Sequence, residues 1–161
     1  DSGVYGSAVN QYWISSTTYL TRTVETNGSG TSFANSSTSS TVYAFLLPPD
    51  TTATSIATSC IYPTDDYAIE VDIESYSGNI SVDIRGSNGN LITRRLDQVS
   101  ESSAFHLKIE LKDGIAKYYV DGDTTASYTS SSTDLSTTFG VRLGLGASGS
   151  VKIKNFKVYP I

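Results

Sequence analysis

The 161-residue sequence contains no methionine and only one cysteine, one histidine and one tryptophan. With a single cysteine, Cys60, no disulfide can form within the chain, and we expect this residue to be a small buried side chain. A Cys/His site is not expected, because the only histidine, His106, lies far from Cys60 in the sequence. The lack of methionine, even at position 1, favours a processed protein or a module of a longer one.

Charged residues are also scarce, at 17% of the chain, and the formal net charge is −5. Nucleic acids and anionic membranes attract basic patches, so neither is expected as a partner. No apolar run is long enough to span a bilayer, and no membrane insertion is expected. A neutral, hydroxyl-rich ligand such as a glycan is compatible with this surface. The expected location is extracellular, at a cell surface or in a virion.

Residues that favour strands are abundant, including eleven tyrosines and many threonines. The most regular stretch is 67–85, YAIEVDIESYSGNISVDIR, in which apolar and polar residues alternate on both sides of the turn SYSGN. Period-two alternation is typical of strands with one buried and one solvent-facing side. We interpret the stretch as a hairpin whose polar side carries Glu70, Asp72, Glu74, Asp83 and Arg85.

Turn signals divide the rest of the chain into further short strands. Asn88-Gly89 and Asp113-Gly114 stand between alternating runs and favour β-hairpins. The segment 55–61 is an uncertain strand. About ten to twelve short strands with no helical stretch predict an all-β fold, an antiparallel two-sheet β-sandwich of jelly-roll type. The whole chain, 1–161, is expected to form one such domain.

Two long segments, FHLKIELKDGIAKYYVDG and FGVRLGLGASGSVKIKNFKVYPI, carry a resemblance to a known superfamily. Residues 67–161 resemble the concanavalin A-like lectins and glucanases, especially laminin-G-like and carbohydrate-binding-module jelly rolls. The resemblance implies a concanavalin A-like sandwich. It says less about function, because the fold carries lectins, glycosidases and adhesion modules.

An acidic strand offers an enzymatic alternative. Residues 70–74, EVDIE, resemble the Glu-x-Asp-x-Glu motif of laminarinase- and lichenase-type glycoside hydrolases. The resemblance implies Glu70 as nucleophile, Glu74 as acid/base and Asp72 as the residue that tunes them. Crowded carboxylates are expected to raise at least one pKa, as a general acid requires. The chain is short for such enzymes and has one tryptophan, so we prefer a solvated, partly paired face and a chain that is not an enzyme.

Sugar recognition requires aromatic rings for the apolar faces of pyranoses and polar groups for their hydroxyls. The aromatic candidates are Tyr12, Trp13, Tyr43, Tyr62 and Tyr76. The polar candidates are Asp83, Arg85, Arg94, His106 and Arg142. The preferred function is a non-catalytic carbohydrate-binding module that recognises a glycan or polysaccharide. The alternatives are a structural or adhesion domain of a virion (such as a phage tail) or of a surface protein, and a small retaining β-glucanase.

No cofactor is expected, although a structural calcium ion is an open alternative. Jelly rolls can hold Ca²⁺ through carboxylate and carbonyl oxygens. The places to look are Asp65-Asp66 and Asp121-Gly122-Asp123. Neither has the spacing of a recognised calcium loop, so no metal ligand is assigned. The sequence does not identify a protein partner.

Overall fold

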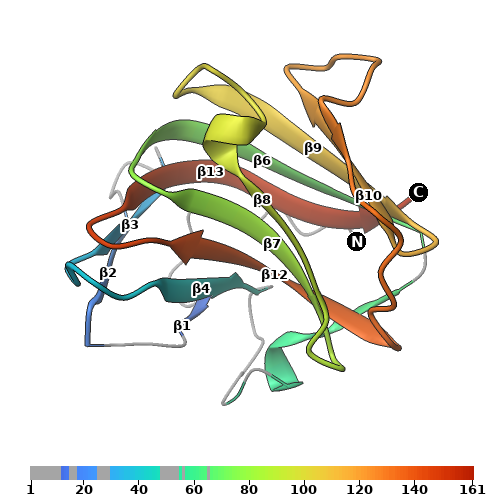
Figure 1. Ribbon diagram of the computed structural model, residues 1–161, viewed down its shortest axis with the longest axis horizontal. Helices are drawn as coiled ribbons and strands as arrows, with labels where there is room; N and C mark the ends of the chain where they lie inside the picture. The colour runs from blue at the N-terminus through green and yellow to red at the C-terminus, as the bar shows by residue number, and fades with distance from the viewer. Residues whose placement is uncertain (1–11, 15–17, 25–29, 48–54, 56, 65) are drawn as a thin grey trace.

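The computed structural model describes residues 12–14, 18–24, 30–47, 55, 57–64 and 66–161, which form two antiparallel β-sheets (Figure 1). Sheet A contains β2 (Leu20–Val24), β3 (Thr31–Asn35), β6 (Tyr67–Ser77), β9 (Phe105–Lys112), β10 (Ile115–Val120), β11 (Tyr128–Thr129) and β13 (Ser150–Pro160). Sheet B contains β1 (Tyr12–Ile14), β4 (Val42–Leu46), β5 (Tyr62–Pro63), β7 (Ile80–Gly86), β8 (Leu91–Arg95) and β12 (Thr138–Leu145). Two short 3₁₀ turns, η1 (Ala57–Ser59) and η2 (Leu96–Gln98), complete the described elements.

The strand order is β11–β10–β9–β6–β13–β3–β2 in sheet A and β1–β4–β12–β7–β8 in sheet B, where β5 also pairs with β12. The apolar side of each long strand is buried between the sheets. In β9, for example, Phe105, Leu107, Ile109 and Leu111 are buried while the residues between them reach the surface. The predicted antiparallel two-sheet sandwich is confirmed. Within the described residues, no helix has the length and apolar character needed to cross a membrane.

The stretch 67–85, predicted as one hairpin, is not a hairpin. β6 lies between β13 and β9 in sheet A, whereas β7 lies between β12 and β8 in sheet B. The turn at Gly78, whose φ is 77°, carries the chain from one sheet to the other. Both strands alternate because each buries one side in the core, whether its neighbour lies beside it or opposite it. The polar sides of β6 and β7 therefore face opposite surfaces of the molecule.

The two predicted hairpin turns are confirmed. Asn88-Gly89 joins β7 to β8, and Asp113-Gly114 joins β9 to β10. Asp113 and Gly114 both have positive φ, 50° and 71°, as a tight turn of the primed type requires. In Figure 1, β7 and β8 end together at one end of the sandwich.

The strand considered for 55–61 is wrong for the part of this segment that the structure describes. η1 stands there instead, over the outer face of sheet B. A Cβ atom on Gly140 of β12 would lie 2.6 Å from the Ser59 carbonyl oxygen, so the turn packs directly on the sheet. Cys60 is buried as expected, and its thiol donates to the Arg85 carbonyl oxygen at 3.4 Å.

Cationic side chains are divided between the two sheets. All six lysines lie on sheet A strands and project from its outer face: Lys108, Lys112, Lys117, Lys152, Lys154 and Lys157. Four of the five arginines lie on sheet B strands: Arg85, Arg94, Arg95 and Arg142. The two outer faces are therefore chemically different.

Candidate functional site

A groove of about 630 Å³ lies over the outer face of sheet B. Its floor is built by side chains from β4, β12, β7 and β8, with Tyr43, Ser81, Asp83, Thr93, Arg95 and Arg142 among them. The turn at Asn79, the turn at 146–147 and Gln98 of η2 also line it. η1 packs on another part of this face, at Gly140 of β12.

Strand register brings these side chains together from distant parts of the sequence. Arg142 is paired with Phe45 on one side and Asp83 on the other, and Asp83 is paired with Thr93. The next row across the sheet contains Tyr43, Gly144, Ser81 and Arg95. Residues opposite one another on one face of a sheet lie about 4.5–5.5 Å apart, so each row forms a continuous strip of side chains.

An ion pair is buried in the groove floor. Arg142 donates from Nε to Asp83 Oδ2 at 2.9 Å, and the side chains are only 10% and 2% exposed. The second oxygen, Oδ1, accepts from the Thr93 hydroxyl at 2.6 Å. The Arg142 guanidinium carbon lies 3.9 Å from the centroid of the Tyr43 ring. Because every member is held by another, the floor is a preorganised surface.

Gly144 gives the groove its depth. A Cβ atom at this position would lie 2.5 Å from Ser81 Oγ and 3.4 Å from the Tyr43 ring. Without a side chain on β12, the tyrosine ring and the serine hydroxyl can lie across the strand. The groove thus depends on a small residue near the end of β12.

Of the predicted site residues, Asp83 and Arg142 line the groove, together with Tyr43. Arg85 is on the same strand as Asp83, but its guanidinium lies beside Gly89 at the end of the sheet and it does not line the groove. Alternation correctly placed Arg85 on the same side of the strand as Asp83. The two side chains do not, however, line the same groove.

The structure places four other candidates elsewhere. The Arg94 guanidinium stacks over the ring of Tyr128 at 4.0 Å and so joins the edges of the two sheets. Tyr76 and Tyr62 pack at the core; burial, followed by the nearby Asp97 carboxylate, raises the pKa of Tyr76. His106 lies on sheet A, on the opposite surface.

Tyr12 and Trp13 belong to β1, at the edge of sheet B beside β4. Their backbones pair with Leu46 and Phe45 respectively. Their side chains lie outside what the structure describes, so their roles as sugar platforms stay predictions.

Several groove residues were not predicted from the sequence, among them Ser81, Thr93, Arg95 and Gln98. Thr93 could have been found from the Asn88-Gly89 turn. Counting outward from that turn pairs Arg85 with Leu91 and then Asp83 with Thr93. Ser81 and Arg95 are the following pair with outward side chains.

The acidic strand β6 faces outward from sheet A, and each of its three carboxylates has a lysine or histidine partner. Glu70 Oε2 lies 2.6 Å from Lys157 Nζ, and Glu74 Oε1 lies 2.7 Å from Lys154 Nζ. Asp72 Oδ1 lies 2.6 Å from His106 Nδ1. Two neutral donors add to the network: the Tyr159 hydroxyl donates to Glu70, and the Asn155 amide donates to Asp72 at 2.6 Å.

These partners reverse the predicted electrostatics of the strand. Burial acts to raise the pKa of Glu70, but hydrogen bonds from Lys157 and Tyr159 outweigh it and the pKa is lowered. For Asp72, burial is likewise outweighed by His106 and Asn155, and the pKa is lowered. The expectation that crowding raises a pKa here is wrong for these two residues, because the hydrogen bonds from their partners outweigh burial.

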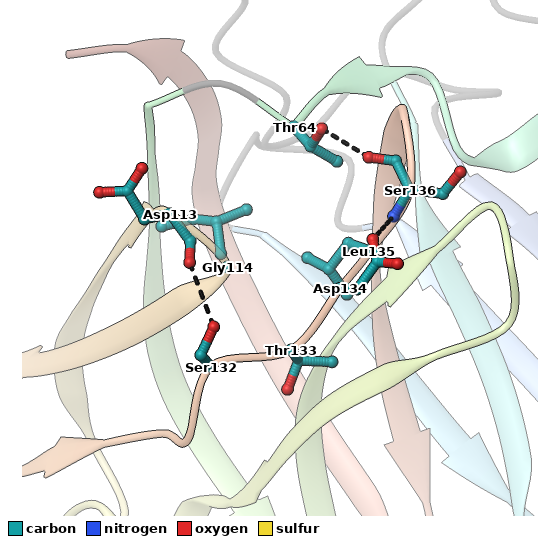
Figure 2. A pocket seen from close by; sticks show the side chains of 9 residues that line it. Thr64, Asp113, Gly114, Ser132, Thr133, Asp134, Leu135 and Ser136 are labelled. Atoms are coloured by element: carbon teal, nitrogen blue, oxygen red, sulfur yellow. Dashed lines mark hydrogen bonds between the residues drawn. The ribbon is translucent and has the colours of Figure 1, made fainter.

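A second pocket, of about 280 Å³, lies at one end of the sandwich, where the segment 132–136 meets the β9–β10 turn (Figure 2). Its polar groups bind one another. The Thr64 hydroxyl donates to the Ser136 carbonyl at 2.7 Å, and the Ser136 amide donates to Asp134 Oδ1 at 2.8 Å. Ser132 donates to the Asp113 carbonyl at 3.4 Å. We interpret this pocket as a structural contact, which we call the seam, that holds the segment 132–136 against the β9–β10 turn. We do not interpret it as a ligand site.

The two places considered for calcium gain no support. Asp121 Oδ1 accepts from the His106 amide at 2.8 Å, which is the contact of a turn residue. Asp66 pairs with Lys112 at 3.2 Å, and Asp65 lies outside the described residues. Among the side chains that the structure describes, no group of three or more His, Cys, Asp or Glu residues could hold a metal ion.

Comparison with solved structures defines the class of fold. The chain has the concanavalin A-like jelly-roll sandwich that its C-terminal half predicted. It is similar to the Crh5 transglycosylase, with a TM-score of 0.65 and 11% identity over 99% of this chain and 83% of that one. No protein-family model and no curated protein matches the sequence.

Two further structures show how varied the proteins with this fold are. An alginate lyase from Corynebacterium sp. has a TM-score of 0.57 and 12% identity over 90% of this chain and 82% of that one. The carbohydrate recognition domain of Emp46p has a TM-score of 0.58 and 13% identity over 99% of this chain and 96% of that one. Identities this low establish the shared fold alone.

One expectation must be corrected in the light of these similarities. From its length and its single tryptophan, the chain was expected not to be an enzyme. The similar structures include a transglycosylase and alginate lyases, and they contradict that expectation. Missing tryptophans and a short chain were therefore poor grounds for excluding catalysis in this fold.

Proposed function

We propose that this protein binds a carbohydrate chain in the groove over sheet B. The observation that carries the proposal is the floor of that groove, where the Tyr43 ring is fixed against the buried Arg142–Asp83 pair. A rigid aromatic ring beside fixed hydrogen-bonding groups is what a pyranose requires, with its apolar face and its hydroxyls. Such a protein would act outside the cell or on a cell or virion surface, where polysaccharides are accessible.

The dimensions and the chemistry of the lining support this proposal. A volume of about 630 Å³ falls within the range of about 300–1,000 Å³ typical of small-molecule sites. Hydroxyl and amide side chains such as Thr41, Asn79 and Gln98 surround the floor and can both donate and accept hydrogen bonds. The names of the similar structures, a carbohydrate recognition domain and several carbohydrate-active enzymes, point to the same class of ligand.

The acidic strand on sheet A is the weaker candidate for such a site. A general acid needs a raised pKa near the working pH, whereas the pKa values of Glu70 and Asp72 are lowered. A pocket of about 390 Å³ does border Asp72 and His106, but the cations and carboxylates around it are bound to one another. The groove over sheet B is therefore the preferred place.

The test is a binding screen against immobilised glycans with the variants Tyr43→Ala and Arg85→Ala. An aromatic stacking contact contributes about 0.5–1.5 kcal/mol, so Tyr43→Ala should weaken binding about two- to tenfold. Arg85→Ala, on the same sheet but outside the groove, should bind normally. Binding that survives Tyr43→Ala, or no binding to any glycan, would overturn the proposal.

The same screen should follow turnover. New reducing ends, unsaturated products and transferred oligosaccharides would be measured on every glycan that binds. Product formation abolished by Tyr43→Ala or Asp83→Asn would make the groove an active centre. Product formation abolished only by Glu70→Gln would move the function to sheet A and contradict the assignment of the groove.

A further inference from the structure

We infer that the groove over sheet B selects an electrically neutral glycan and rejects anionic ones, an inference that rests on the proposed function. The first ground is the pairing of Arg142. Its Nε donates to Asp83 at 2.9 Å, and one face of its guanidinium lies against Tyr43. Both oxygens of Asp83 are already occupied, by Arg142 and Thr93. The pair is thus electrically balanced.

The second ground is that the other arginine in the groove is also balanced. Arg95 donates from Nε to Asp97 Oδ1 at 3.0 Å and makes a second contact from its terminal nitrogen to Oδ2. This is a bidentate arginine–carboxylate pair. Among the described residues that line the groove, each cation therefore has its own carboxylate.

Nearby cations do not alter this balance. The Arg94 guanidinium is stacked on Tyr128, away from the groove. All the lysines project from sheet A. A carboxylate or sulfate on a sugar would compete with Asp83 for the buried Arg142, or with Asp97 for the more exposed Arg95. Separating Asp83 from its buried partner would leave an uncompensated charge.

The rest of the lining suits a neutral sugar. It offers hydroxyls and amides from Thr41, Asn79, Ser81 and Gln98, and an apolar patch at Leu91, which is 39% exposed. Hydroxyl and amide groups match the hydroxyls of a hexose polymer without requiring charge. Alginate, which names several proteins of similar fold, is a polymer of uronic acids, and the described lining of this groove has no cation without a carboxylate partner for such a chain.

The test compares neutral and anionic polysaccharides at two salt concentrations. Laminarin and cello-oligosaccharides would serve as neutral probes, and alginate and polygalacturonate as anionic ones. With about 50 and 500 mM NaCl, the affinity for a neutral probe should change less than about twofold, and the anionic probes should not bind. Binding of an anionic probe that requires Tyr43 and falls about tenfold in high salt would overturn the inference while leaving the proposed function intact. If no probe binds at all, the proposed function fails and the inference fails with it.

A variant that removes the carboxylate partner of a groove arginine tests the inference in a second way. Asp97→Asn leaves Arg95 without its carboxylate on an exposed part of the groove, so the fold should tolerate it. We expect this variant to gain salt-sensitive binding to alginate, about tenfold above the parent, with neutral binding unchanged. Asp66→Asn releases Lys112 on the opposite face and should gain nothing. Equal behaviour of the two variants would contradict the inference.

Discussion

Asp83 is the residue on which the groove depends most. Its carboxylate is almost completely buried and holds both Arg142 and Thr93. Removing one partner of a buried ion pair typically costs about 3–5 kcal/mol, because the remaining charge is uncompensated. We therefore expect Asp83→Asn to lower the free energy of unfolding by about 3 kcal/mol in chemical denaturation.

Two variants make the Asp83 prediction specific. Arg85→Ala, also on the outer face of β7, should cost less than about 0.5 kcal/mol. Adding Arg142→Gln to Asp83→Asn should recover part of the loss, since no buried charge is then left. Equal losses for Asp83→Asn and Arg85→Ala would show that the pair contributes little.

Two glycines with similar backbone conformations offer a matched test of the seam in Figure 2. Gly114 has φ 71° and Gly122 has φ 83°, and each follows an aspartate in a turn. A Cβ atom on Gly114 would collide with the Thr133 carbonyl oxygen, whereas one on Gly122 would have nothing within 4 Å. Gly122→Ala should cost about 1 kcal/mol from backbone strain alone.

Gly114→Ala should cost a further 1–3 kcal/mol or so, because a backbone atom must move. Thermal or denaturant unfolding of the two variants measures the difference. If the two costs are equal, the segment 132–136 yields freely and is not fixed by the β9–β10 turn.

At the scale of elements, β6 illustrates how ion pairing links stability to pH. The pKa values of Glu70 and Asp72 are lowered in the folded protein from ordinary values of 4.5 and 3.8. Their contribution to stability is therefore complete above these values and is lost as the pH falls through the lower, folded-state pKa values. Partly exposed pairs contribute modestly, so the variant Glu70→Gln/Asp72→Asn should be about 1–2 kcal/mol less stable than the parent at pH 7.

The difference should shrink as the pH is lowered below about 4. Denaturation curves of the double variant and of the parent across pH 2–8 or so would measure it. Glu101→Gln, an exposed loop residue, should follow the parent at every pH. If the difference in stability between the double variant and the parent stays constant at acidic pH, the effect of the double variant comes from side-chain shape and not from charge.

The elements also show what the sequence could predict. Alternation in β9 and β10 and the Asp113-Gly114 turn specify a local hairpin, and the structure has it. For β6 and β7, the same alternation could not decide between a hairpin within one sheet and a connection between two sheets. In both cases the apolar side of each strand is buried in the core, so the sequence pattern is the same. Asp83 and Arg142 are 59 residues apart. Alternation placed Asp83 on the polar side of its strand, but its contact with Arg142 depends on β12 lying beside β7, which no local pattern specifies.

At the scale of the whole molecule, the division of lysines and arginines between the sheets predicts a selective response to chemical modification. Lysine methylation acts on sheet A, and arginine-directed reagents such as phenylglyoxal act on Arg95 at the groove, which is substantially exposed. We expect exhaustive methylation to leave glycan binding within about twofold of the parent, since it preserves charge. Phenylglyoxal should abolish binding, and a saturating glycan should protect Arg95, as mass spectrometry of modified peptides would show.

Asn79, at the rim of the groove, has a consequence for how the protein is produced. It is exposed and is followed by Ile80 and Ser81, a sequence that N-glycosylation machinery accepts. Asn35 begins the same kind of signal, but its buried amide donates to the carbonyl oxygens of Leu145 and Gly146 at 3.0 Å, so a glycan at this position is incompatible with the folded structure. Material secreted from a eukaryotic host would carry an oligosaccharide beside the mouth of the groove and could fill it with its own sugar. A bacterial host, or the variant Asn79→Gln, would keep the surface clear.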